Sequence, residues 1–235
     1  MTILILGGTA EARALSAELG VGAVLSLAGV TKKPLANPHR TGGFGGVEGL
    51  AGYLQAKNIQ GVIDATHPFA AQMSQNAYDA TIRLKLPLLR LERVPWPRAP
   101  EWKNVASLQD AATAIPTKAR VFLSIGSQSI NPFIAREDIW CLTRSIEPPE
   151  SLPPHGEAVL QRPPFTLESE LTLMRRHKIS HLVSKNAGGA ATFAKLKAAA
   201  TLGIQVIMVK RPPLPEVLTV ETVPEAVKWV ENLGD

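Results

Sequence analysis

The opening of the chain constrains its fold more than any other stretch. Ile3 to Leu6 form a short apolar run, which is typical of a strand buried on both faces of a parallel sheet. Gly7 and Gly8 end this run, and Thr9 is a suitable N-cap for the helical pattern that follows. Because glycines let backbone amides approach a ligand and a helix start favours negative charge, the turn predicts a nucleotide or phosphate site. A first βα turn without a ligand is the alternative, since the Gly-x-Gly-x-x-Gly fingerprint is absent.

The composition indicates a globular protein with an acidic ligand. The 235 residues suffice for one large α/β domain or two small ones, and no apolar run approaches membrane-spanning length. Cys141 is the only cysteine and no signal peptide is recognised, so we expect no disulfide, no metal site and a cytoplasmic location. A formal charge of +5 and a pI of about 9.5 suit acidic partners. A small polyanion is favoured over nucleic acid, because aromatic residues make up only 5% and no basic stripe stands out.

Strand and helix patterns alternate along the chain in two runs. Apolar segments that indicate further strands lie at 23–27, 60–64, 88–91, 121–125, 139–143, 181–184 and 204–209. Such alternation is typical of parallel sheets with right-handed crossovers. Prolines at 95, 97 and 100 interrupt the pattern between the two runs. We therefore predict an α/β fold of two Rossmann-like lobes with parallel sheets and an interlobe cleft. The predicted domains are a nucleotide-binding domain at 1–94, a Pro-rich linker at 95–106 and an α/β domain at 107–235.

The end of the second expected strand bears on which dinucleotide would bind. A dinucleotide fold places the adenine ribose there, and an acidic residue would favour NAD. The sequence has no acid at this point and instead offers Ser26, Thr31 and Lys32, which favours NADP. A glycine-rich loop follows, with Gly43, Phe44 and Gly45 at its centre, and such a loop can come close to a ligand. Ordinary solvated surface loops are the alternative interpretation of both segments.

A polar turn follows the third expected strand, where ligands bind in open α/β sheets. Thr66, His67 and Pro68 lie in this turn. His67 is a candidate proton donor or hydrogen-bonding group, although a capping or buried structural histidine fits the same position.

The second half of the chain has its own candidate site. Lys185 and Asn186 end a predicted strand and are followed by Gly188 and Gly189, so a charge, an amide and open backbone N–H groups would gather there and suit a carboxylate. Arg144 and Arg211 are candidates to extend this cationic wall. A glycine-eased turn with solvated cations is the alternative.

These motifs together resemble the precorrin-6A reductase family, which includes the cobalt-precorrin-6A reductases, NADPH-dependent enzymes of cobalamin biosynthesis. The resemblance spans nearly the whole chain. It rests on the opening Ile-Leu-Gly-Gly-Thr-Ala-Glu-Ala and on the segments 42–46, 64–71, 91–93, 185–189 and 211–212. Two positions depart from the family pattern: Val30 stands where an arginine is common, and Pro163 replaces the glycine of Gly-Pro-Phe.

The resemblance implies a reaction and a distribution of site residues. Hydride from NADPH would add to one carbon of a double bond of precorrin-6A, and a proton to its neighbour, giving precorrin-6B. Because the cofactor carries the chemistry, no conspicuous catalytic residue is expected. His67 and Lys185 are the candidates if a side chain takes part. Gly8, Thr9 and Glu11 would lie at the cofactor turn. The partner would be a tetrapyrrole with several carboxylates, neither nucleic acid nor membrane, and contacts with neighbouring pathway enzymes are expected.

Two alternatives from other classes stay open. One is an NADP-dependent reductase or epimerase of a smaller substrate, for which Tyr53 and Lys57 match a Tyr-x-x-x-Lys pair literally, but in a helix where that chemistry would not place them. The other is a non-catalytic nucleotide-binding protein.

Overall fold

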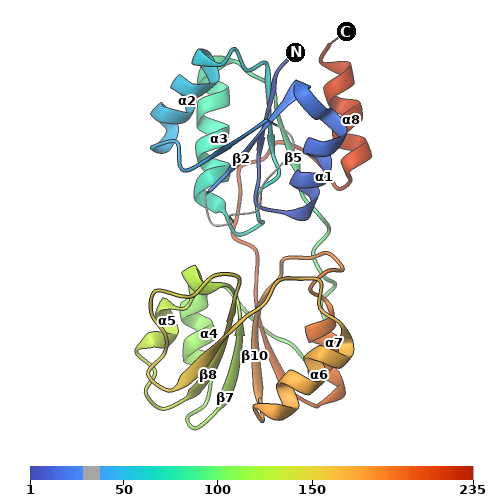
Figure 1. The fold of residues 1–235 in the computed structure, drawn as a ribbon. Helices are drawn as coiled ribbons and strands as arrows, with labels where there is room; N and C mark the ends of the chain where they lie inside the picture. Colours follow the sequence, from blue (N-terminus) through green and yellow to red (C-terminus); the bar gives the residue numbers. More distant parts are fainter. Residues whose placement is uncertain (29–37, 235) are drawn as a thin grey trace. The chain divides into compact units, whose positions relative to one another are not determined.

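The protein divides into two α/β units, and its computed structural model describes residues 1–28 and 38–234 (Figure 1). The first unit comprises Met1–Val94 with Pro212–Asp235, and the second comprises Pro95–Arg211. Each unit holds one six-stranded sheet whose neighbouring strands run parallel. The predicted α/β fold with two Rossmann-like halves is confirmed.

The first unit has the strand order β12-β5-β4-β1-β2-β3. Its strands are β1 (Ile3–Leu6), β2 (Ala23–Leu27), β3 (His39–Thr41), β4 (Gly61–Asp64), β5 (Leu88–Leu91) and β12 (Leu218–Val220). Its helices are α1 (Ala10–Leu19), the short η1 (Gly20–Gly22), α2 (Gly46–Ala56), α3 (Ala71–Leu84) and α8 (Val223–Asn232).

Helices cover both faces of this first sheet. Figure 1 shows α1 and α8 on one face and α2 and α3 on the other. Successive residues of β1 serve opposite faces: Ile3 and Ile5 pack with the α1 and α8 side, whereas Leu4 and Leu6 pack with the α2 and α3 side. Because both faces are buried, the strand is apolar at every position, as the opening sequence predicted.

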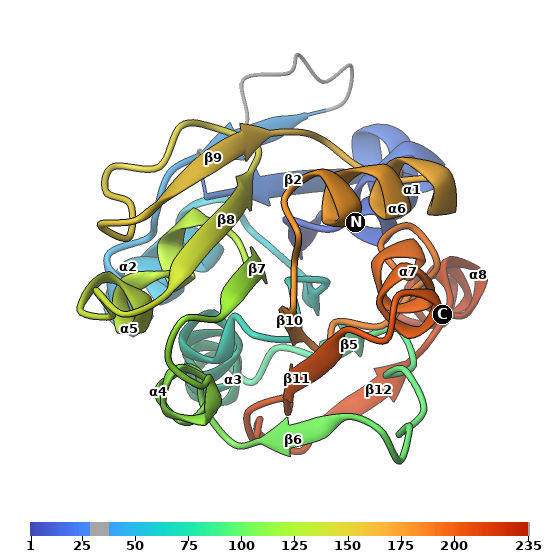
Figure 2. The same ribbon diagram turned by 90° about the horizontal axis from the view of Figure 1, so that it is seen from below.

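The second unit repeats this arrangement with the order β6-β11-β10-β7-β8-β9, which Figure 2 shows in succession. Its strands are β6 (Lys103–Val105), β7 (Arg120–Ser124), β8 (Trp140–Ser145), β9 (Gly156–Leu160), β10 (His181–Lys185) and β11 (Gln205–Val209). Its helices are α4 (Leu108–Ala114), η2 (Ser127–Ser129), α5 (Asn131–Ile134), α6 (Leu167–Arg176) and α7 (Ala194–Thr201). Helices α6 and α7 pack together over one face of the sheet, and α4 and α5 over the other.

The two units exchange their last strand–helix pair. Strand β6 follows β5 in sequence, yet it pairs with β11 of the second sheet, and β12 follows β11 yet pairs with β5 of the first. Both exchanged pairs start their helix with a capping box, formed by Ser107 with Asp110 and by Thr222 with Glu225. With the exchange included, each sheet has the Rossmann order 3-2-1-4-5-6.

The exchange changes the expected domain boundaries. The last 24 residues from Pro212 were assigned to the second domain, but β12 and α8 complete the first sheet and its core, where Ala226 and Val230 are buried. The expected linker at 95–106 is in part regular structure, because Lys103–Val105 form β6. The chain therefore passes between the units twice, at Val94–Pro95 and at Arg211–Pro212.

Candidate functional site

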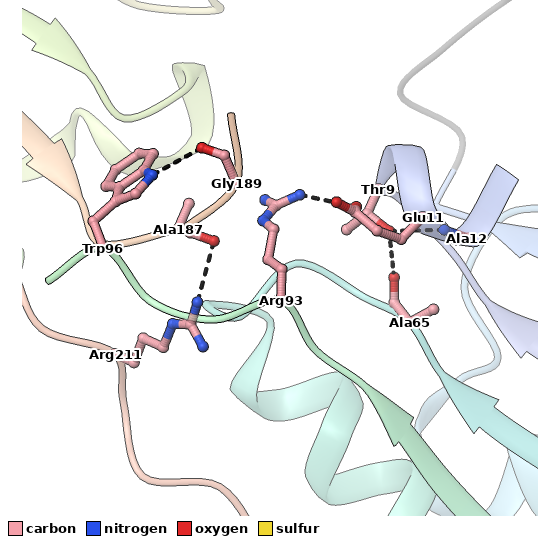
Figure 3. A network of polar contacts seen from close by, with 9 residues as sticks. All are labelled: Thr9, Glu11, Ala12, Ala65, Arg93, Trp96, Ala187, Gly189 and Arg211. Carbon is pink, nitrogen blue, oxygen red and sulfur yellow. Dashed lines mark hydrogen bonds and ion pairs between the residues drawn. The ribbon is translucent and has the colours of Figure 1, made fainter. Parts of the chain in front are cut away.

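The predicted turn after β1 lies at the switch point of the first sheet. Strands β1 and β4 are neighbours there, and the chain continues from them toward opposite edges, which is where open α/β sheets bind ligands. Thr9 is the N-cap of α1, accepting a hydrogen bond from the Ala12 amide at 3.1 Å. Its hydroxyl donates to the Ala65 carbonyl at 2.8 Å (Figure 3). Thr9 therefore ties the helix start to the residue that follows β4.

Glycine is required on both sides of this turn. A Cβ atom at Gly7 would stand 2.7 Å from Leu25 Cδ1 and 3.1 Å from the Ser26 carbonyl oxygen, so β1 and β2 could not pack as they do. Gly8 has a φ of +132°, which side chains rarely allow, and it is exposed. The backbone at Gly8 is therefore open to a ligand.

An ion pair closes one side of the turn. Glu11, in the first turn of α1, lies 2.9 Å from Arg93, which follows β5 (Figure 3). Both side chains are about three-quarters buried. The pair offsets the negative charge of Glu11 at a helix start that would otherwise repel a phosphate. A hollow in the surface is lined by Thr9, Glu11, Thr66, Pro68, Leu91, Glu92 and Arg93.

Arg40 is a candidate site residue that the sequence analysis missed. It lies on β3 and donates to Ser26 Oγ and to the Gly42 and Gly43 carbonyl oxygens, each at 2.9 Å. Its guanidinium also stacks over the Phe44 ring, 3.9 Å from the centroid. Arg40 thus joins the end of β2 to the glycine-rich loop. Ser26 is buried, and its hydroxyl accepts the hydrogen bond from Arg40. Thr31 and Lys32, which were also expected near the ribose, lie outside the described residues.

The glycine-rich loop is held against α2. A Cβ atom at Gly49 would stand 1.7 Å from the Phe44 carbonyl oxygen, so the helix backbone itself contacts the loop. The Phe44 ring meets the Tyr53 ring edge to face, with centroids 5.3 Å apart. Gly45 takes a left-handed conformation just before the helix. The loop that includes Gly43, Phe44 and Gly45 therefore has a defined place beside Arg40.

The turn after β4 is organised by Asp64. Its Oδ1 accepts hydrogen bonds from the Thr66 amide at 3.2 Å and from the Thr66 hydroxyl at 2.7 Å. His67 Nδ1 accepts from the Phe69 amide at 3.2 Å, and Pro68 is buried. The next helix, α3, begins only at Ala71, and residues 67–70 form a separate turn before it. The three predicted residues Thr66, His67 and Pro68 lie together at the carboxyl edge of the first sheet.

The second unit places Lys185 at the corresponding edge of its own sheet. Lys185 ends β10 beside β7, the switch point of that sheet, and its Nζ donates to Ser129 Oγ at 2.6 Å. Burial lowers the pKa of the Lys185 ammonium below its ordinary value. A cation is therefore held at the position where this sheet would meet a ligand.

The loop after Lys185 is built as a structural clamp. Asn186 accepts from the Trp96 amide at 2.8 Å and donates to the Trp96 carbonyl at 3.1 Å. The Trp96 indole donates to the Gly189 carbonyl at 2.8 Å and Arg211 donates to the Ala187 carbonyl (Figure 3). Arg211 also donates to the Asn186 carbonyl. Both polar atoms of the Asn186 side chain are thus hydrogen-bonded to the backbone of Trp96.

Two expectations for this loop need adjustment. Gly188 and Gly189 were expected to offer open backbone N–H groups just after the strand; both take positive φ and α7 begins only at Ala194, so these groups do not lie at a helix N-terminus. Arg144, expected to extend the cationic wall, is buried on β8 and pairs with Glu170 of α6. Lys185 therefore leads directly into the loop of Gly188 and Gly189, which Arg211 contacts. Arg144 lies in the interior of the unit instead.

Among residues 1–28 and 38–234, no group of three or more His, Cys, Asp or Glu side chains could hold a metal ion. No helix in the same part of the chain is long and apolar enough to span a bilayer.

The sheet order and the Gly-Gly-Thr turn at the switch point define the dinucleotide-binding class of α/β proteins. The chain belongs to the precorrin-6x reductase family CbiJ/CobK, whose family model matches residues 2–231. The precorrin-6A reductase of Rhodococcus erythropolis is 48% identical over 242 residues, with 98% of each chain covered. A solved CobK precorrin-6A reductase, 44% identical, superposes with a TM-score of 0.92 and covers 100% of this chain and 98% of that one. The cobalt-precorrin-6A reductase of Priestia megaterium is 25% identical, with 98% of each covered. The protein is thus an oxidoreductase whose family implies a nicotinamide cofactor.

Proposed function

We propose that this protein reduces precorrin-6A to precorrin-6B with NADPH. The family match over residues 2–231 carries the proposal, and the ligand edge of the first sheet supports it. Bound NADPH would supply a hydride to one carbon of a macrocycle double bond, while a proton joins the adjacent carbon. The protein binds and orients the two reactants, and solvent or a substrate tautomer delivers the proton. The exposed turn at Gly8 and the Glu11–Arg93 pair fit the pyrophosphate.

The residues at the end of β2 support NADPH rather than NADH. Ser26 stands where an acidic residue would bind the ribose of NAD, and Arg40 donates to it. A guanidinium is well suited to a phosphate because its planar donors match the phosphate oxygens. We infer that Arg40 binds the 2′-phosphate of NADPH, with Thr31 and Lys32 as further ligands proposed from the sequence.

Replacing Arg40 by glutamine should therefore alter cofactor choice. We expect the KM for NADPH to rise about tenfold, since one charge-assisted contact is lost, and kcat/KM with NADH to stay nearly unchanged. Steady-state kinetics with both cofactors measures this. Arg83→Gln, at an exposed ion pair with Glu48 in the same unit, is the matched control. Equal losses with NADPH and NADH would show that Arg40 only supports the glycine-rich loop.

The second unit offers the cations for the substrate carboxylates. Lys185 ends the strand that leads into the loop containing Gly188 and Gly189, and Arg211 donates to the Ala187 carbonyl of that loop. We propose that this loop binds the tetrapyrrole, with Asn186 maintaining its shape through Trp96. The buried Arg144 would contribute only indirectly, by holding Phe165 in place. The Phe165 ring centroid lies 3.8 Å from the guanidinium carbon of Arg144.

The natural substrate is proposed to be the metal-free macrocycle. The relative named precorrin-6A reductase is 48% identical, whereas the one named cobalt-precorrin-6A reductase is 25% identical. Incubating the protein with NADPH and either macrocycle, and following the absorbance of the reduced nicotinamide, tests this. We expect rapid NADPH oxidation with metal-free precorrin-6A and slower oxidation with the cobalt form. NADPH binding without oxidation by either form would support a non-catalytic protein, and oxidation only by a smaller substrate would support the other alternative.

A further inference from the structure

A second hollow in the first unit lies on the opposite side of the switch point from Arg40. It is lined by Asp64, Thr66, His67, Pro68, Ser74, Arg90, Leu91, Glu92 and Leu214. Asp64 ends β4 and Arg90 lies directly opposite it on β5, one position before that strand ends. Both therefore stand at the carboxyl edge of the sheet, where ligands bind.

Arg90 is buried with two of its donor nitrogens unused. Its side chain is 8% exposed, and among the described residues neither Nε nor Nη2 has a hydrogen-bond partner. The third nitrogen, Nη1, donates to the Pro215 carbonyl at 2.9 Å, which fixes the orientation of the guanidinium. Buried donors without a partner are rare in folded proteins, so the two nitrogens indicate a missing acceptor.

Asp64 supplies an acceptor beside these donors. Its Oδ1 is occupied by Thr66, while Oδ2 lies 3.7 Å from Arg90 Nε, too far for a hydrogen bond. The side chain is 3% exposed and its charge offsets that of Arg90. Asp64 and Arg90 therefore present an acceptor and a donor side by side in the hollow, and the charges of these two residues balance. A carboxylate would be repelled by Asp64, whereas a primary amide has one acceptor and one donor at matching positions.

We propose that Asp64 and Arg90 bind the carboxamide of the nicotinamide ring. Arg90 donates to the amide oxygen and Asp64 Oδ2 accepts from the amide nitrogen. The inference rests on the proposed function, and the fold supports it independently: in a 3-2-1-4-5-6 sheet the adenosine half lies over β1 to β3, so the nicotinamide half lies over β4 and β5. Fixing the carboxamide sets which face of the ring is presented to the substrate, so the two residues orient the hydride donor.

Asp64→Asn tests this pairing with little change of shape. The asparagine oxygen still accepts from Thr66, while its nitrogen places a donor where the amide nitrogen needs an acceptor. Three nucleotides are compared by titration: NADPH, its reduced 3-acetylpyridine analogue, in which a methyl ketone replaces the amide, and 2′,5′-ADP, which lacks the nicotinamide. Asp79→Asn, on the outer side of α3, is the matched control. Arg90→Gln is a second variant, and its thermal unfolding is compared with that of the wild type to confirm that it is folded before its nucleotide binding is measured.

The wild type should bind NADPH about tenfold more tightly than the analogue, and Asp64→Asn should abolish that preference while leaving 2′,5′-ADP binding unchanged. Arg90→Gln should weaken NADPH and the analogue alike, because both present the oxygen, but spare 2′,5′-ADP. If Asp64→Asn keeps the wild-type preference, the hollow holds a structural water only and the inference fails. If the wild type binds none of the three nucleotides, the proposed function fails instead.

Discussion

Lys185→Ala is expected to raise the KM for precorrin-6A by about 100-fold while the KM for NADPH changes less than about threefold. Lys185 lies at the switch point of the second sheet, whereas every residue proposed to bind NADPH belongs to the first unit. Its ammonium is partly buried and donates to Ser129, so a substrate carboxylate would meet an oriented cation rather than a mobile surface one. Steady-state kinetics with each reactant varied in turn measures the two KM values.

The pH dependence of kcat/KM for the substrate is a second test of the role of Lys185. Burial lowers the pKa of Lys185, and only the charged ammonium attracts a carboxylate, so kcat/KM for the substrate should fall as the pH rises through that lowered pKa. Lys185→Arg keeps a charge at all accessible pH values and should remove the fall. Lys197→Ala, on the exposed side of α7, is the control. A larger rise in the KM for NADPH than for the substrate would reverse the proposed roles of the two units.

The interior strands were predictable because burial on both faces leaves a strong signal. The bounds of β1, β2 and β5 match the predicted segments, since each is a run of mostly apolar residues that packs against helices on two sides. The edge strands were missed for the opposite reason. The strands β3, β6, β9 and β12 are mostly exposed or half-buried, and three of them have only three residues, so no apolar pattern marks them.

The exchange of β6 and β12 could not be predicted from local sequence. A capping box at Ser107 or Thr222 shows where a helix begins, but both boxes would look the same whichever sheet the preceding strand joins. Pairing across the chain is a tertiary choice, and the prolines near 95 and 212 indicate only that the chain leaves regular structure there. The predicted domains were therefore continuous stretches of sequence, whereas the first unit of the structure combines the start of the chain with its end.

The candidate site was predictable where glycines mark it and not where single charges do. Gly8 and Thr9 at the first turn, and the loop after Lys185, carry recognisable turn chemistry. Arg40 lies on an exposed edge strand that gave no pattern. Arg90 did leave a signal that was overlooked: in the predicted strand at 88–91, whose other residues are apolar, an arginine needs a partner or a ligand to meet its charge.

Glu170→Leu is expected to destabilise the protein by about 3–5 kcal/mol, although Glu170 touches no proposed ligand. Glu170 is 1% exposed on α6 and pairs with Arg144, which is itself 5% exposed on β8. Burial lowers the pKa of the Arg144 guanidinium and the neighbouring carboxylate opposes that shift, so Glu170 offsets the cost of burying this cation inside the unit. Removing the carboxylate leaves a buried cation without an anion. Urea denaturation of the variant and the wild type measures the loss.

Arg144→Met/Glu170→Leu distinguishes the cost of an unpaired charge from a loss of packing. The guanidinium carbon of Arg144 lies 4.8 Å from the Phe122 ring centroid and 3.8 Å from that of Phe165, so its surroundings suit an apolar side chain. Replacing both partners removes the charge together with its need for compensation, and the double variant should recover most of the stability that the single variant loses. If it is no more stable than Glu170→Leu alone, the pair contributes through specific hydrogen bonding rather than charge balance. In that case Ser124, 3.3 Å from Arg144 Nη2 at the end of β7, becomes the next residue to vary, because it would link the pair to the ligand edge of the second sheet.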